Sequence, residues 1–205
     1  LVAVAAAIAL EGNEGGTVVT DSITSSGLKE FIEDTLGGQH YRYRRGYKNV
    51  IDKALELNAQ GINCPLAIET SGHAAMKENY FLDDGAYLCT KIIIKAAQMR
   101  KEGKELDELT AALKEPVESK EVRFKILEPD FRACGEKIIN DLTAYAMAQN
   151  GWNVANDNRD GWFLLRLSVH DPIMPLNIES DSVGGVDIIY NKLNEFLKTT
   201  SGLEL

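Results

Sequence analysis

The chain of 205 residues has a formal net charge of −9, and 44% of its residues are hydrophobic. This length suits one large or two small domains, and the composition excludes a disordered chain or a coiled coil. The acidity argues against nucleic-acid binding, because Asp and Glu would repel a phosphate backbone. The three cysteines are odd in number and scattered, so we expect a cytoplasmic protein without a disulfide framework.

The chain opens with an apolar run, LVAVAAAIAL, from Leu1 to Leu10. This run is too short to span a bilayer, and no basic segment precedes it as in a signal peptide. We therefore predict a buried helix and no association with a membrane. Because the first residue is not Met, we also expect the chain to be a piece of a longer protein.

Strand and helix patterns alternate through the first half of the chain. Strands are predicted at residues 17–21 and 64–69, with an extended basic segment at 40–46. Helices are predicted at 28–36, at 48–61 and after Asp83-Asp84, and Gly37-Gly38 ends the first of them. Strands separated by helices of this length favour right-handed crossovers. We therefore predict an α/β domain with a mainly parallel sheet.

The second half has a different order of elements. The segment KEPVESK, residues 114–120, interrupts the pattern and is the predicted linker. A strand at 122–127 and a helix at 131–145 are followed by three strands at 152–155, 162–167 and 174–178, then a helix at 186–197. This β-α-β-β-β-α order predicts an α+β domain whose antiparallel sheet is covered by two helices. The predicted domains are residues 1–114 and 115–205.

Polar residues follow the apolar strand at 64–69, in the segment Glu69-Thr70-Ser71-Gly72-His73. Ligands bind beyond the carboxyl ends of parallel strands, where a carboxylate and a hydroxyl can each bond sugar hydroxyls. Alternatively, Glu69 and Ser71 only cap the next turn. A lone histidine such as His73 is more typical of a structural residue than of a catalytic base.

A second polar segment, RLSVHDP at residues 166–172, leaves a predicted strand. The guanidinium of Arg166 offers a planar fork of donors that matches phosphate, and alternation places Ser168 on the same face. The alternative is a surface arginine paired with a neighbouring acid. The basic cluster at Arg44 to Lys48 could attract a phosphorylated ligand or form a solvated turn.

These segments, in this order, resemble the α-D-phosphohexomutase superfamily of phosphoglucomutases and phosphomannomutases. The third of that family's four domains carries a G-[FY]-K segment, a sugar-binding E-x-S-G-H loop and a D-D-G helix start. The matching segments here are Gly46-Tyr47-Lys48, Glu69-Thr70-Ser71-Gly72-His73 and Asp83-Asp84-Gly85.

The fourth domain of the family carries a phosphate loop of the form R-P-S-x-T-x-P. Arg166, Ser168 and Pro172 match it, whereas Leu167 replaces the usual proline and His170 stands where threonine is common. The resemblance implies a sugar-binding α/β domain at residues 1–114. It implies a phosphate-binding domain at residues 115–205, with a sheet similar to that of TATA-box-binding protein.

The resemblance further implies a parent enzyme that interconverts hexose 1-phosphate and hexose 6-phosphate, using a phosphoserine, Mg²⁺ and a hexose 1,6-bisphosphate. The family's phosphoserine and D-x-D-x-D-R magnesium loop lie in its first two domains, and neither pattern occurs here. We therefore expect this chain to recognise hexose phosphate beside those domains, with no turnover and no bound metal of its own. The alternative is a stand-alone sugar-phosphate-binding or regulatory module. The implied sugar-binding residues are Lys48, Glu69, Ser71 and His73, and the implied phosphate-binding residues are Arg166, Ser168 and His170.

Overall fold

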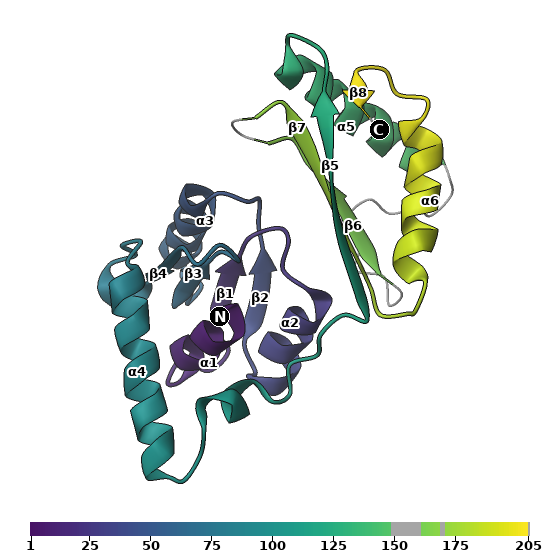
Figure 1. The fold of residues 1–205 in the computed structure, drawn as a ribbon. Coiled ribbons are helices and arrows are strands. Elements are labelled where there is room, and N and C mark those ends of the chain that lie inside the picture. Colours follow the sequence, from purple (N-terminus) through teal and green to yellow (C-terminus); the bar gives the residue numbers. More distant parts are fainter. Residues whose placement is uncertain (149–160, 169–170, 205) are drawn as a thin grey trace. The chain divides into compact units, whose positions relative to one another are not determined.

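The structure, a computed structural model, describes residues 1–148, 161–168 and 171–204. It consists of two units, Leu1–Glu115 and Pro116–Leu205, and each has its own sheet (Figure 1). Each unit also has its own buried hydrophobic clusters.

The sheet of the first unit is mixed. Its strands are β1 (Thr17–Thr20), β2 (Gln39–Arg42), β3 (Leu66–Ile68) and β4 (Ala74–Met76), in the order β2-β1-β3-β4. Both β2 and β3 pair in parallel with β1, whereas β4 pairs antiparallel with β3. The prediction of a mainly parallel sheet is confirmed. The short strand β4 was not predicted, because three apolar residues carry too little periodicity to indicate a strand.

Helices cover both faces of this sheet. The α-helices are α1 (Val2–Leu10), α2 (Ser26–Glu30), α3 (Tyr47–Ala59) and α4 (Gly85–Lys101), and three short helices are η1 (Phe31–Thr35), η2 (Lys77–Asn79) and η3 (Leu106–Thr110). The predicted N-terminal helix is confirmed, since seven of the nine residues of α1 are buried. Helix α2 begins where the hydroxyl of Ser25 accepts the N–H of Leu28 at 3.1 Å.

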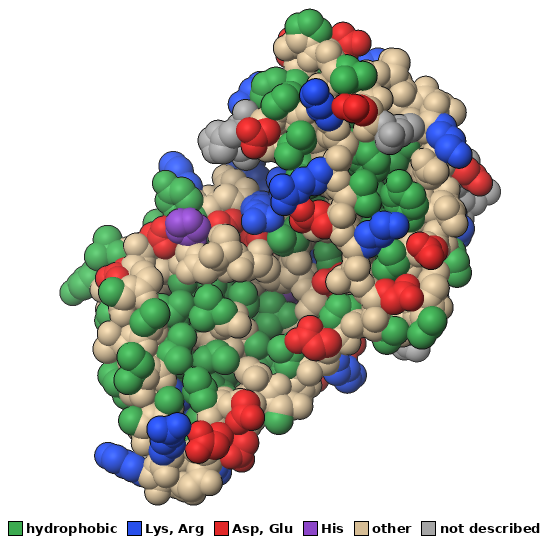
Figure 2. Space-filling model, viewed as in Figure 1, with side chains coloured by type: hydrophobic (Ala, Val, Ile, Leu, Met, Phe, Trp, Pro, Cys, Tyr) green, Lys and Arg blue, Asp and Glu red, His purple; other side chains and the backbone are tan. Residues whose placement is uncertain are grey.

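Two clusters of buried residues show which helices cover which face. One cluster joins α1, η1 and α4 to Val18, Leu66 and Ile68, while the other joins α3 to Val19 and Ala67. Because β1, β3 and β4 are buried on both faces, their sequences show no alternation of buried and exposed positions, whereas β2 is partly exposed. On the outer surface, hydrophobic side chains gather where α1 and α4 lie (Figure 2).

The sheet of the second unit is antiparallel throughout. Its strands are β5 (Glu118–Ile126), β6 (Trp162–Leu165), β7 (Ile173–Ser180) and β8 (Leu203–Glu204), in the order β6-β7-β5-β8. Helices α5 (Phe131–Ala148) and α6 (Gly185–Leu197) share one buried cluster with all of its long strands. The predicted antiparallel sheet with two helices is therefore confirmed.

Three details of the second half differ from the sequence analysis or fall outside the structure. The predicted linker extends too far, because Glu118 and Lys120 already pair with Ser180 and Ile178 of β7. Charged side chains on this exposed end of β5 concealed a strand that its backbone hydrogen bonds define. The strand β8 was not predicted, and the predicted strand at 152–155 lies outside the described residues.

Candidate functional site

The carboxyl ends of β1, β2 and β3 meet at one edge of the first sheet, because these three strands are parallel. Asp21 follows β1, and Glu69 follows β3. The segment after β2 leads through Arg45 and Gly46 into the first turn of α3. Three stretches that are far apart in the sequence therefore reach the same edge of the sheet.

The carboxylate of Glu69 connects two of these stretches. Its side chain is buried, with 4% exposure, and its Oε1 accepts the backbone N–H of Gly46 at 2.6 Å. Gly46 is the N-cap of α3 and has a φ of +121°. Because glycine has no side chain, this residue cannot cap the helix itself. A carboxylate there satisfies a free N–H and faces the positive end of the helix dipole. Glu69 thus caps a helix that precedes it in the chain, which differs from the capping of the next turn considered as the alternative.

The loop that follows Glu69 is a tight hairpin between β3 and β4. The N–H of Glu69 donates to the His73 carbonyl at 2.9 Å, and the N–H of Gly72 donates to the Glu69 carbonyl at 3.0 Å. Gly72 has a φ of +98°, which favours glycine at this turn. The hydroxyl of Ser71 donates to Oε2 of Glu69 at 3.3 Å, and Ser71 is exposed at the hairpin tip. Its oxygen is therefore accessible to a ligand.

His73 connects this hairpin to the starts of two helices. Its Nδ1 lies 2.7 Å from Oδ2 of Asp83, just before α4, and its ring stacks on Tyr47 with centroids 5.1 Å apart. Asp84 caps α4 by accepting the N–H of Tyr87 at 2.9 Å. In the tautomer with a hydrogen on Nδ1, the Nε2 of His73 is left as an acceptor.

Lys48 lies in the first turn of α3, two residues after the N–H that Glu69 binds. Its ammonium contacts Asp52 of the same helix at 2.7 Å, and 76% of the side chain is exposed. The structure thus brings the Lys48 backbone to the same edge as Glu69, Ser71 and His73. The Lys48 side chain, however, is bonded to its own helix.

Asp21 is a further residue of this edge that the sequence analysis did not select. Its carboxylate is fully buried and accepts the Thr70 N–H at 3.2 Å and the Thr70 hydroxyl at 2.9 Å. Nε of Arg45 lies 3.9 Å from the same carboxylate. Burial raises the pKa of Asp21, while the Thr70 hydrogen bonds and the Arg45 charge oppose this effect. In the sequence, the one indication that Asp21 belongs to this edge was its position at the end of a predicted strand, which Glu69 shares.

In the second unit, Arg166 and Ser168 extend the pairing of β6 with β7. The N–H of Arg166 donates to the Pro175 carbonyl at 3.1 Å, and that of Ser168 donates to the Ile173 carbonyl at 3.0 Å. Leu165 points into the core, so alternation directs Arg166 and Ser168 to the face opposite α5 and α6. The Ser168 oxygen accepts the Asp171 N–H at 3.4 Å. His170 lies outside the described residues.

The surroundings of Arg166 contain both signs of charge. Hydrogen bonds from Arg123 and Asn177 lower the pKa of Glu121, and the Arg166 charge contributes to this shift. Nε of Arg123 donates to Glu121 at 2.7 Å. Arg166 is thus close to an acid, as the structural alternative required, although that acid already has another arginine as its partner.

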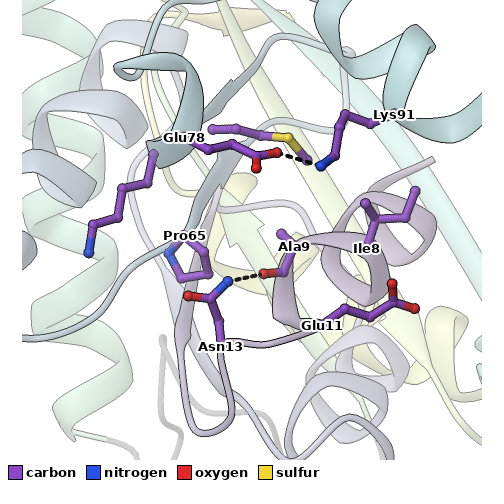
Figure 3. A pocket seen from close by; sticks show the side chains of 9 residues that line it. Ile8, Ala9, Glu11, Asn13, Pro65, Glu78 and Lys91 are labelled. Atoms are coloured by element: carbon purple, nitrogen blue, oxygen red, sulfur yellow. Dashed lines mark hydrogen bonds and ion pairs between the residues drawn. The ribbon is translucent and has the colours of Figure 1, made fainter. Parts of the chain in front are cut away.

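A cavity of about 310 Å³ lies at the opposite edge of the first sheet, where β3 begins and β4 ends (Figure 3). Pro65, Glu78 and Lys91 are among its lining residues, and Glu78 and Lys91 form an ion pair at 2.8 Å. No residue lining this cavity is a predicted site residue. The cavity is therefore separate from the candidate site.

Within residues 1–148, 161–168 and 171–204, no three His, Cys, Asp or Glu side chains are grouped to hold a metal ion. Among the described helices, none combines the length and the apolar character that a transmembrane span requires.

Comparison with known proteins relates the chain to sugar-phosphate mutases. Residues 1–117 match the family model for phosphoglucomutase/phosphomannomutase, alpha/beta/alpha domain III. A phosphoglucomutase of Neisseria gonorrhoeae is 23% identical over 201 residues, which is 95% of this chain and 41% of that protein. A phosphoglucomutase of Neisseria meningitidis gives the same identity and coverage. The chain thus spans about two fifths of the length of these curated relatives.

Solved structures share the fold. A phosphoglucomutase/phosphomannomutase family protein of Burkholderia thailandensis has a TM-score of 0.76 and 24% identity, covering 97% of this chain and 41% of that one. N-acetylphosphoglucosamine mutase of Aspergillus fumigatus, in complex with GlcNAc-6P and magnesium, has a TM-score of 0.59 and 14% identity. That match covers 96% of this chain and 46% of the fungal chain. At identities below 25%, these two similarities show only that the fold is shared.

Proposed function

The chain belongs to the phosphoglucomutase/phosphomannomutase family, and we propose that it is the substrate-recognition part of a phosphohexomutase. The parent enzyme would interconvert hexose 1-phosphate and hexose 6-phosphate. Its phosphoserine and magnesium loop would come from segments outside this sequence, since neither pattern occurs here. In this proposal the sugar is bound by Lys48, Glu69, Ser71 and His73, and the phosphate by Arg166, Ser168 and His170.

One observation carries the proposal: the hydrogen bond of 2.6 Å from the Gly46 N–H to Glu69. It joins the segment Gly46–Lys48 to the hairpin Glu69–His73 at the carboxyl edge of the sheet. These two segments are those in which the sequence matches the family's sugar-recognition motifs. Ligand sites of α/β sheets occupy this edge, so the contact supports a shared site.

The proposed contacts are chemically suited to a sugar phosphate. The exposed hydroxyl of Ser71 can donate to and accept from sugar hydroxyls. Lys48 would have to leave Asp52, and an exposed ion pair of this kind contributes little to stability. Arg166 would bind phosphate through two parallel N–H donors. A mutase must accept its substrate in two orientations, so contacts shared by both orientations are expected.

We propose that Mg²⁺ and a hexose 1,6-bisphosphate serve the parent enzyme through its other domains. Support comes from solved complexes of the fungal N-acetylphosphoglucosamine mutase with magnesium and with glucose 1,6-bisphosphate. In this chain the two buried carboxylates, Asp21 and Glu69, already have hydrogen-bond partners at the site edge. In this proposal the recognition role of the chain uses no metal of its own.

Calorimetric titration of the 205-residue chain tests this function. We expect α-D-glucose 1-phosphate to bind more tightly than glucose or inorganic phosphate, because both ends of the ligand are recognised. Ser71→Ala and Arg166→Ala should each weaken binding. The matched controls Ser201→Ala and Arg100→Ala, both at exposed positions away from the motifs, should not. Equal affinity for the sugar phosphate and for inorganic phosphate would overturn the proposal.

A further inference from the structure

Asp21 is a buried carboxylate that the proposed contacts with substrate do not use. Among the described residues, the buried Asp and Glu side chains are Asp21 and Glu69. The exposure of Asp21 is 0%, so it has no direct access to a ligand. Burying a carboxylate is costly unless hydrogen bonds and an opposite charge compensate.

The partners of Asp21 come from the two segments of the proposed sugar site. From the hairpin, the Thr70 N–H donates to Oδ1 at 3.2 Å and the Thr70 hydroxyl donates to Oδ2 at 2.9 Å. From the other segment, Nε of Arg45 approaches Oδ2 at 3.9 Å. Thr70 lies between Glu69 and Ser71, and Arg45 precedes Gly46. The Asp21 carboxylate thus contacts one residue within the Glu69–His73 hairpin and the residue directly before Gly46.

We propose that Asp21 is a positioning residue, which fixes the Glu69–His73 hairpin against the Arg45–Gly46 segment in the arrangement that binds the sugar. This inference rests on the proposed function. Glu69 and Gly46 form a direct link between the same two segments, at 2.6 Å. The two links together hold the hairpin at two successive residues, which fixes both its position and its direction.

The hydrogen bond between Asp21 and Thr70 can be changed conservatively from either side. Thr70→Ser keeps the hydroxyl, whereas Thr70→Val keeps the shape and removes the hydroxyl that donates to Asp21. Asp21→Asn keeps an acceptor for the Thr70 N–H but loses the charge that attracts Arg45. These variants change the link without creating a large cavity.

The test measures the affinity of the 205-residue chain for α-D-glucose 1-phosphate, together with its unfolding free energy. We expect Asp21→Asn and Thr70→Val each to lower the affinity roughly tenfold, comparable to one charge-assisted hydrogen bond. Thr70→Ser should retain the wild-type affinity. The double variant should lose no more than either single one, because both changes break the same link.

Thr24→Val is the control for general damage to this loop. Thr24 is buried in the same loop, and its hydroxyl donates to the backbone carbonyl of Asp21 at 3.1 Å, not to its carboxylate. It should lower stability and leave the affinity unchanged. Wild-type affinity in Asp21→Asn and Thr70→Val would overturn this inference and leave the proposed function standing. Absence of wild-type binding would overturn both.

Discussion

Arg166 is the residue on which the proposed phosphate contact depends most. Losing a charge-assisted hydrogen bond costs about 1.5–3 kcal/mol, which is roughly tenfold to a hundredfold in affinity. Arg166→Lys keeps the charge but loses the planar fork, so it should weaken binding of glucose 1-phosphate, and Arg166→Ala should weaken it further. Calorimetry with melting temperatures measured beside it separates binding from folding. An unchanged affinity, or a loss fully explained by unfolding, would show that Arg166 is structural.

Asp21 makes the stability of the first unit depend on pH. Its pKa is raised above the ordinary value of 3.8, chiefly by burial, so folding favours the protonated form. The stabilising contribution of Asp21 is therefore greatest below about pH 4 and is lost as the pH rises through the raised pKa. Asp21→Asn has no such titration.

We expect the unfolding free energy of Asp21→Asn, relative to wild type, to increase as the pH rises from about 4 towards neutrality. Denaturant unfolding of both proteins at several pH values measures this difference. The other charged residues facing Asp21, Arg45 and Glu69, are present in both chains. A difference that decreases with pH would mean that the folded protein favours the ionised carboxylate.

At the scale of residues, sequence reasoning placed some side chains and could not place others. A polar segment after a buried strand indicated the edge where Glu69 and Ser71 lie. The partner of Glu69, the Gly46 N–H, is a backbone group 23 positions away, and no side-chain pattern reveals it. Asp21 resembled an ordinary loop acid, because only the packed structure shows its burial and its bonds to Thr70.

Helix α3 supplies a prediction at the scale of elements, because a glycine with positive φ stands at each of its ends. Gly46 has φ +121° before the helix, and Gly61 has φ +84° after it. Alanine at either position should cost about 1–3 kcal/mol of unfolding free energy through backbone strain. Of these two glycines, Gly46 is the one whose N–H bonds Glu69, so Gly46→Ala should also weaken binding of glucose 1-phosphate.

Gly61→Ala serves as the matched control, because an added Cβ there meets nothing within 4 Å. A Cβ at Gly46 would lie 2.7 Å from Nδ2 of the Asn49 side chain, so this side chain, which donates to the Arg45 carbonyl, must move. Chemical denaturation and calorimetry of the two variants make the comparison. Equal losses of affinity would mean that strain anywhere in α3 disturbs the site, and the specific role of Gly46 would be rejected.

The sequence predicted elements well where periodicity was strong and less well where pairing decided the structure. The helices at α3, α4 and α6 follow apolar spacing that the sequence displays directly. The strand β3 was predicted, but β4 was read as part of a loop, because it has only three residues. The charged start of β5 was read as linker, although its backbone pairs with β7. Short or exposed strands are defined by distant partners, which local sequence does not contain.

At the scale of the whole chain, the two units have separate buried clusters and separate sheets. Domains of about this size can fold alone when they have their own core. We therefore expect residues 1–115 and residues 116–205, expressed separately, each to give a dispersed amide spectrum and a cooperative unfolding transition. Nuclear magnetic resonance and denaturant titration of the two pieces provide the check. Poor dispersion in either piece would show that its core depends on the other unit.

The central claim is that one chain recognises both the sugar and the phosphate of a hexose phosphate. Titration of the isotope-labelled 205-residue chain with α-D-glucose 1-phosphate, followed through its backbone amides, tests it most directly. We expect the amides of Gly46, Ser71 and Ser168 to shift and to saturate with the same dissociation constant. No saturable shift at these residues, or different dissociation constants for the two units, would contradict the claim.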